Sequence, residues 1–234
     1  MAYENTLTLD ILPLTADTAR LVRVYGTSPC VELPAALPAP EGGSFWVTQL
    51  GDYCFSEKPR ALPAPEALCR YEVSETGTVR LIRAYGQPVG GSGGRRYDLD
   101  FDAAPETEQL HPVCGSFVEE ITLPDSLRVV GGCAFYNCRR LRLLSIGAQP
   151  LTVGSDVFLN CFALETLLVR AAPETPTGLF AVVNNITEAV QAVFQPAGAA
   201  KPAAALWYPA YWEDIEETPA HILLHTFSGQ GYHY

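Results

Sequence analysis

The hydrophobic positions of residues 118–170 follow one pattern that occurs twice and begins a third time. The segment VEEITLPDSLRVVGGCAFYNCRR is followed without a gap by LRLLSIGAQPLTVGSDVFLNCFA and then by LETLLVR, so each full unit has 23 residues. A fixed period of this length predicts a solenoid, in which each unit buries its apolar face by stacking on the next. Equivalent positions carry equivalent side chains, namely Val118 and Leu141, Ile121 and Leu144, Leu123 and Ile146, Gly131 and Gly154, Phe135 and Phe158, Asn137 and Asn160, and Cys138 and Cys161.

Alternation within each unit predicts which side chains point outward. Val118, Ile121 and Leu123, with their equivalents, are expected to fill the interior, and their neighbours are expected on the open face of the sheet, which solenoids use for binding. Leu143 and Leu168 are apolar at positions where solvent contact is expected, which favours a contact surface. The alternative is that the cap or the insert folds over these two leucines. The candidate partner-binding residues are Glu120, Thr122, Leu143, Ser145, Thr166, Leu168 and Arg170.

Residues 1–56 have the alternating pattern of strands. TLTLDILP, residues 5–12, predicts an edge strand, and residues 19–25 predict a second strand. A weaker copy of the repeat follows, since VELP at residues 31–34 resembles the ITLP of the first clear repeat, and residues 47–55 resemble the stretch before its phenylalanine. We therefore expect an N-terminal β segment with a degenerate first repeat.

Residues 57–117 interrupt the array as an insert. A strand at residues 78–85 and a second one in RRYDLDFD, residues 95–102, flank a glycine-rich stretch. Two strands on either side of such a stretch predict a β-hairpin with its tip at residues 90–94.

Residues 171–234 lose the period and are expected to form an α/β cap, because the apolar end of a solenoid has to be covered. A helix is predicted at residues 175–190 and a strand at residues 189–196. An irregular aromatic stretch follows at residues 205–220, and a last strand is predicted at residues 221–227. The helix would place Leu179, Val182, Val183 and Ile186 on one face. The whole chain is thus predicted to be mainly β with some α, built around a short solenoid.

The repeat pattern I-x-L-P-x-S-L-x-x-x-G-x-x-A-F-x-x-C-x-x-L resembles the BspA-type leucine-rich repeat of bacterial proteins. The clear match covers residues 118–170, a little under a quarter of the chain. The resemblance implies a leucine-rich solenoid that acts as a non-catalytic binding or adhesion module. We therefore expect a protein partner, bound through the open strand face.

The charge balance excludes some classes of partner. Apolar residues make up 48% of the 234 residues and the formal net charge is −11. An acidic surface argues against nucleic acid and against an anionic membrane, because both require basic faces. Seven cysteines cannot all pair within the chain, which favours free, buried thiols.

The N-terminal sequence MAYENTLTLDILPLT lacks the basic region and the apolar run of a signal peptide, and no run of about 18 or more apolar residues follows. These features predict a cytoplasmic location without membrane insertion. The alternative is a secreted or cell-surface location after loss of a leader, which the resemblance implies because proteins with this repeat are often displayed there.

An aromatic and acidic tail at residues 206–217 supports a different hypothesis, a carbohydrate-binding or surface adhesion module. Exposed rings can stack on a sugar or anchor a partner, and rings can equally well pack inside the cap. A third interpretation is a structural subunit of a larger assembly. The candidate ligand-binding residues of the tail are Trp207, Tyr208, Tyr211 and Trp212.

No enzymatic chemistry is predicted. Residues 90–94 fit G-x-S-x-G but lack the strand and helix that position a catalytic serine. His221 and His225 lie four apart on a predicted strand, and Ile222 stands where a zinc hydrolase has glutamate. Residues 213–217 lack the central glycine of a calcium loop. We expect no metal, cofactor or catalytic residue.

Overall fold

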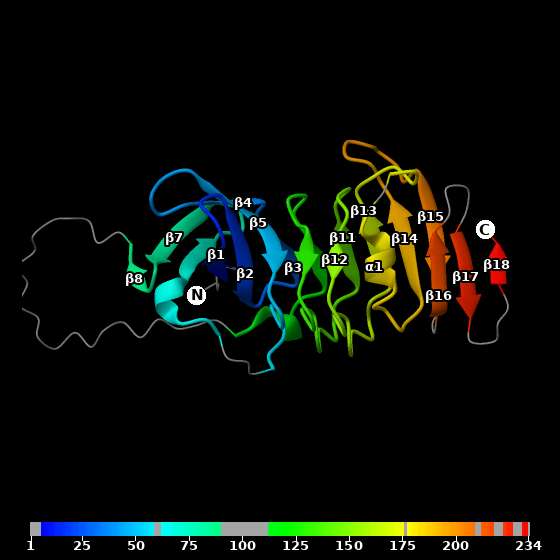
Figure 1. Ribbon diagram of the computed structural model, residues 1–234, viewed down its shortest axis with the longest axis horizontal. Helices are drawn as coiled ribbons and strands as arrows, with labels where there is room; N and C mark the ends of the chain where they lie inside the picture. Colours follow the sequence, from blue (N-terminus) through cyan, green and yellow to red (C-terminus); the bar gives the residue numbers. More distant parts are fainter. Residues whose placement is uncertain are drawn as a thin grey trace, which may run out of the picture.

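The computed structural model describes residues 6–58, 62–89, 112–175 and 177–208, and the backbone alone for residues 212–217, 222–226 and 231–233. Within these residues the chain is mainly β, with one short α-helix and two 3-10 turns at Pro65–Ala67 and Cys114–Ser116. The coils of the solenoid follow one another along the long axis of the molecule, with the N-terminal strands at one end (Figure 1).

Five parallel strands form one side of the solenoid. Their register places Glu120 beside Leu143 and Leu143 beside Thr166, which confirms the 23-residue period. A sixth strand, β15, joins in antiparallel orientation at one end. In spatial order the sheet contains β3 (Cys30–Glu32), β9 (Glu120–Thr122), β11 (Leu143–Ile146), β13 (Thr166–Val169), β14 (Val190–Phe194) and β15 (Ala204–Tyr208).

The stack of parallel strands does not stop at Arg170, where the sequence period ends. Thr166 pairs with Gln191, a step of 25 residues, so β14 continues the array after a coil that is two residues longer. Backbone pairing thus continues past Arg170, where the side-chain pattern has changed. At the other end Val31 pairs with Ile121, so the segment predicted as a degenerate first repeat joins the same sheet.

A second sheet lies on the other side of the coils and runs into the N-terminal strands. The predicted edge strand β1 is central, between β2 and β6, because the insert supplies β6 beside it. In order the sheet contains β12 (Thr152–Val153), β10 (Val129–Val130), β5 (Ser44–Leu50), β2 (Thr18–Tyr25), β1 (Leu7–Pro13), β6 (Cys69–Val73), β7 (Val79–Ala84) and β8 (Gln87–Pro88), and β4 (Ala36–Pro38) pairs with β5.

The insert differs from the predicted hairpin as far as it is described. β7 pairs with β6 on one side and with the two residues of β8 on the other. The partner strand at residues 95–102 and the glycine-rich tip at residues 90–94 lie outside the described residues.

The C-terminal part contains a shorter helix than predicted. α1 spans only Leu179–Val183, and the chain leaves the helix at Asn184. The predicted apolar face is nevertheless buried, with Ile186 only 6% exposed. The predicted strand at residues 189–196 is confirmed as β14, whereas the stretch expected to be irregular forms β15 and β16 (Trp212–Glu217). β16 pairs with β17 (Ile222–Thr226), which pairs with β18 (Gly231–His233).

Repeated side chains hold the coils together. Val118, Ile121 and Leu123 and their equivalents are at most 2% exposed, which confirms the predicted interior. Phe135 stacks between Phe55 and Phe158, with ring centroids 5.1 Å and 5.3 Å away. Asn137 and Asn160 share a φ of 66°, a left-handed conformation that asparagine tolerates better than most residues, and the Asn160 amide donates to Oδ1 of Asn137 at 2.7 Å.

Close stacking of the coils makes one glycine hard to replace. A Cβ at Gly131 would lie 2.6 Å from the backbone nitrogen of Asp52, whereas a Cβ at Gly132 would meet nothing nearer than 3.4 Å. Gly131→Ala is expected to lower the free energy of unfolding by about 1–3 kcal/mol, and the matched Gly132→Ala to change it by about 0.5 kcal/mol or less. Denaturant titration followed by circular dichroism measures both, and equal stabilities would contradict this explanation.

Candidate interaction surface

The open side of the six-stranded sheet carries two rows of outward side chains, which we call the strand face. Strand register defines each row, because paired residues of neighbouring strands point to the same side of a sheet. The first row contains Cys30, Glu120, Leu143, Thr166, Gln191 and Trp207. The second row contains Glu32, Thr122, Ser145, Leu168, Val193 and Ala205.

The structure brings the candidate partner-binding residues together on this face. Glu120 is exposed, and Thr122, Leu143, Thr166 and Leu168 are partly exposed. Ser145 leaves the candidate set because it is only 2% exposed.

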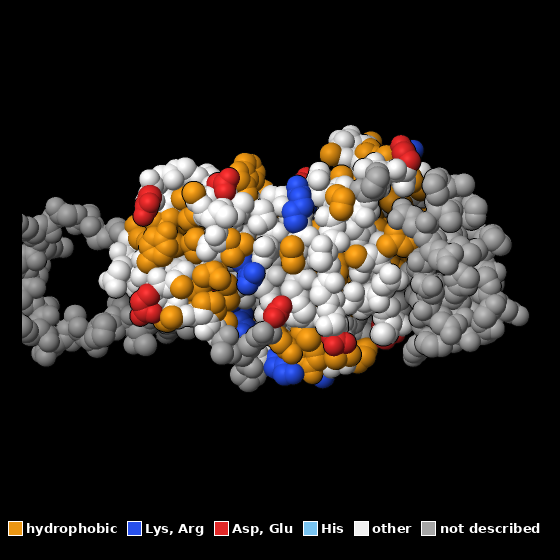
Figure 2. All heavy atoms as spheres, viewed as in Figure 1, with side chains coloured by type: hydrophobic (Ala, Val, Ile, Leu, Met, Phe, Trp, Pro, Cys, Tyr) orange, Lys and Arg blue, Asp and Glu red, His pale blue; other side chains and the backbone are white. Residues whose placement is uncertain are grey.

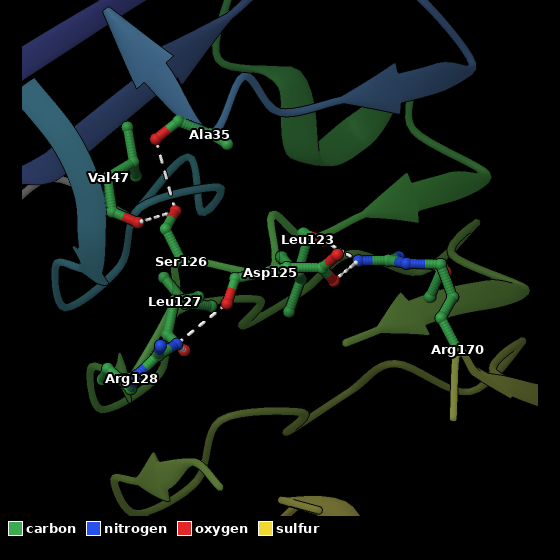
Figure 3. A network of polar contacts seen from close by, with 9 residues as sticks. Ala35, Val47, Leu123, Asp125, Ser126, Leu127, Arg128 and Arg170 are labelled. Atoms are coloured by element: carbon green, nitrogen blue, oxygen red, sulfur yellow. Dashed lines mark hydrogen bonds and ion pairs between the residues drawn. The ribbon is translucent and has the colours of Figure 1, made fainter. Parts of the chain in front are cut away.

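Arg170 explains the burial of Ser145. Its guanidinium crosses from the end of β13 and donates to Oγ of Ser145 at 2.6 Å, to the carbonyl oxygen of Leu123 at 2.5 Å and to Oδ1 of Asp125 at 2.7 Å (Figure 3). Arg170 therefore ties together the ends of three strands, and much of its hydrogen-bonding capacity is already used within the chain.

The loop after β9 is held from the other side as well. Oγ of Ser126 donates to the carbonyl oxygen of Val47 at 2.8 Å, and Arg128 donates to the carbonyl oxygens of Asp125 and Leu127 (Figure 3). These bonds fix the backbone of residues 123–128 at the border of the strand face.

The aromatic tail divides between the two sides of the sheet. Trp207 is 55% exposed and pairs with Gln191, so it belongs to the strand face. Tyr208 is 1% exposed and leaves the set of candidate ligand-binding residues because it points into the core. Tyr211 lies outside the described residues, and only the backbone of Trp212 is described. The two candidate sets of the sequence thus meet on one surface at Trp207.

Other exposed hydrophobic side chains lie away from the strand face. Figure 2 shows them over the N-terminal sheet and along the lower edge of the array, where the turns between the two sheets lie. In those turns Leu159 is 45% and Phe162 is 63% exposed. Both side chains are apolar and exposed but lie off the strand face.

A groove of about 920 Å³ opens at the β3 end of the strand face, and we call it the β3 groove. One wall is β3 with the residues that follow it, and the opposite wall is the turn at residues 74–77 between β6 and β7. Glu120, Thr122 and Arg170 of the candidate set line it too. Sequence patterns missed the groove because its two walls lie far apart in the chain.

Most of the cysteine thiols are buried. All seven are free, and five are buried, as the odd number of cysteines predicted. Burial raises the pKa of Cys114 and of Cys161 to about 12, so both remain neutral and unreactive near pH 7. Cys30 is exposed in the β3 groove, and its pKa is raised by partial desolvation and by the nearby charges of Glu120 and Glu119.

Within the described part of the chain, no group of three or more His, Cys, Asp or Glu side chains could hold a metal ion. The side chains of the C-terminal histidines and of the acidic run at residues 213–217 lie outside the described residues. None of the described helices is long and apolar enough to cross a membrane.

Comparisons with known proteins agree with the repeat pattern. No curated protein is significantly similar to the chain in sequence. The fold resembles, at a TM-score of 0.37 and 10% identity, the crystal structure of a leucine-rich cell surface protein from Faecalibacterium prausnitzii A2-165. The match covers 95% of this chain and 58% of that protein. The predicted cytoplasmic location finds no support in these comparisons.

Residues 114–191 match the family model described as the BspA type leucine-rich repeat region, with six copies. The matched range reaches from the turn before β9 into β14, the same coils whose strands pair in parallel. Residues 114–191 of this chain are therefore a BspA-type leucine-rich repeat region.

Proposed function

We propose that this chain is a non-catalytic module that binds a protein partner through the strand face. One observation carries the proposal: two rows of outward side chains continue over six strands and include partly exposed Leu143 and Leu168 and the exposed ring of Trp207. Tryptophan is among the residue types that most often supply a large share of the affinity in protein interfaces, and exposed apolar side chains that lie together favour a contact surface. The repeat family supports the proposal, because it suggests a protein-interaction or surface module.

The size of the face also fits a protein better than a small sugar. Neighbouring strands lie about 4.8 Å apart, so six strands span roughly 24 Å. Among the described residues of the tail, Trp207 is the one exposed ring, whereas a sugar site would require further groups around it. A secreted or surface location, which the repeat resemblance implies, stays a prediction.

Substitution of the two leucines tests the proposal. Leu143→Glu/Leu168→Glu places charges at the centre of the face and is expected to weaken partner capture from the source organism's extracts at least about 100-fold, a loss of about 2.7 kcal/mol. The matched variant Leu159→Glu/Phe162→Glu adds the same charges to exposed apolar positions off the face and should retain the partner. Quantitative mass spectrometry of the captured proteins measures both effects.

The melting temperature of each variant, measured in parallel, separates lost binding from lost folding. Equal capture by the wild type and by Leu143→Glu/Leu168→Glu would reject the strand face as the binding site. In that case Trp207→Ala on glycan arrays tests the carbohydrate alternative, which requires that this substitution abolish glycan binding.

A further inference from the structure

Resting on the proposed function, we propose that the β3 groove accepts an extended segment of the partner that carries lysine or arginine and pairs as a strand with the open edge of β3. The proposal adds partner chemistry to the strand face. It depends on three features of the groove, namely its backbone edge, its dimensions and its charge.

The first feature is the edge of β3. In the described part of the chain β3 pairs with β9 alone and ends the six-stranded sheet. The amides of Glu119 and Glu120 donate to Pro29, and the amide of Leu33 donates to Thr122. Because backbone groups of a strand alternate in direction, the peptide groups of Glu32 turn the other way, into the groove. Such an edge is a template for an added strand.

The second feature is the size of the groove. A residue within a sheet occupies about 3.3 Å along its strand, about 4.8 Å between strands and about 10 Å between layers, or roughly 160 Å³. The groove volume of about 920 Å³ therefore holds about five or six residues in extended conformation. The turn at residues 74–77 also lines the groove, so the space beside β3 is bounded by a second element.

The third feature is the charge of the lining. Glu32, Glu120 and Asp125 line the groove, and Arg170 is the one basic residue among its lining residues. Arg170 is bonded to Asp125 and to the carbonyl oxygen of Leu123, so it offsets little of the remaining negative charge. The pKa of the Cys30 thiol is raised first by partial desolvation and then by the charges of Glu120 and Glu119, which lie close to β3. A cationic strand complements this negative charge.

Synthetic peptides test the proposal on the full chain. The probes are acetyl-TKVKVKT-amide, its acidic counterpart acetyl-TEVEVET-amide, and acetyl-TKVPVKT-amide, whose central proline lacks an amide hydrogen. Cys30 reports occupancy, because a strand beside β3 shields its thiol from alkylation by iodoacetamide. Cys133 is partly exposed, does not line the groove and serves as the internal control. Mass spectrometry measures the alkylation rate of each thiol.

The lysine peptide is expected to slow alkylation of Cys30 at least about tenfold at saturation and to leave Cys133 unchanged, with weaker protection at high salt. The acidic and proline peptides should not protect. Glu32→Lys/Glu120→Lys should weaken binding of the lysine peptide at least about tenfold. Glu66→Lys/Glu174→Lys changes the net charge equally at exposed positions outside the groove and should leave binding unchanged.

Three outcomes would overturn the proposal: no protection by the lysine peptide, equal protection by the proline peptide, or equal protection by spermidine, which would make the groove a site for small cations. The proposed function is tested by a different measurement, because it is rejected if Leu143→Glu/Leu168→Glu still captures the partner. Loss of capture by that variant together with no peptide protection would leave the strand face as the binding site and reject only the role of the groove.

Discussion

Phe135→Ala is expected to lower the free energy of unfolding by about 3–5 kcal/mol, the usual cost of removing a fully buried phenylalanine. Phe135 has no exposed surface and contacts the rings of Phe55 and Phe158 on the coils before and after it. In a solenoid each coil is stabilised by its neighbours, so this substitution weakens two interfaces at once. Differential scanning calorimetry should show the melting temperature fall by roughly 6–20 °C.

Phe162→Ala is the matched control, because it removes the same ring from a position that is 63% exposed. Its expected effect is within about 0.5 kcal/mol. Phe135→Leu keeps most of the apolar volume and should fall between the two. If Phe135→Ala cost less than about 1 kcal/mol, the stacked rings would not be what couples the coils.

The sequence was sufficient to predict the coils because their side chains repeat at a fixed spacing. Val118 and Ile121 are buried where the period places them, and the weak copy at residues 31–34 pairs with the first clear repeat as predicted. β14 could not be predicted as part of the array, because its coil is two residues longer and lacks the repeated leucine and phenylalanine pattern. Backbone pairing continues the array through that coil, and Val190, Ala192 and Phe194 of β14 are buried in the same core.

The candidate interaction surface was predictable only in part. The alternation of apolar and polar residues predicted that the side chains of Leu143 and Leu168 point outward. It could not predict that Arg170 of the neighbouring strand covers Ser145. Trp207 reaches the same surface because the chain reverses direction after β14 and β15 pairs with it, in a stretch that the sequence pattern predicted to be irregular. The β3 groove depends on a turn of the insert packing near β3, which no local pattern encodes.

Asp10 is the clearest case in which the tertiary fold determines a residue's environment. On the predicted edge strand its carboxylate would face water, but β1 is central and Asp10 is 2% exposed. Arg70 donates to it from β6 through two nitrogens, Nε to Oδ1 at 2.7 Å and Nη2 to Oδ2 at 2.9 Å. From β2 the Tyr25 hydroxyl donates to Oδ2 at 3.1 Å, and burial together with the Asp10 charge raises the pKa of Tyr25 to about 12.

Asp10→Ala is therefore expected to cost about 3–5 kcal/mol, because it leaves the largely buried guanidinium of Arg70 without its carboxylate. Glu72→Ala is the matched control on the same sheet. It breaks the ion pair with Arg80, whose side chain is 70% exposed, and exposed pairs of this kind contribute about 0–1 kcal/mol. Urea titration of both variants, followed by tryptophan fluorescence, measures the difference.

The double variant Asp10→Leu/Arg70→Leu shows where the cost of Asp10→Ala arises. If the penalty comes from a stranded charge rather than from lost attraction, removing both charges should restore about 1–4 kcal/mol relative to Asp10→Ala, because apolar side chains can replace a buried ion pair without loss. Arg23, the neighbour of Asp10 on β2, keeps its own bond to the carbonyl oxygen of Ser56 in either variant. A double variant no more stable than Asp10→Ala would mean that the ion pair itself, through its two-nitrogen geometry, holds β1 and β6 in register within the N-terminal part of the sheet.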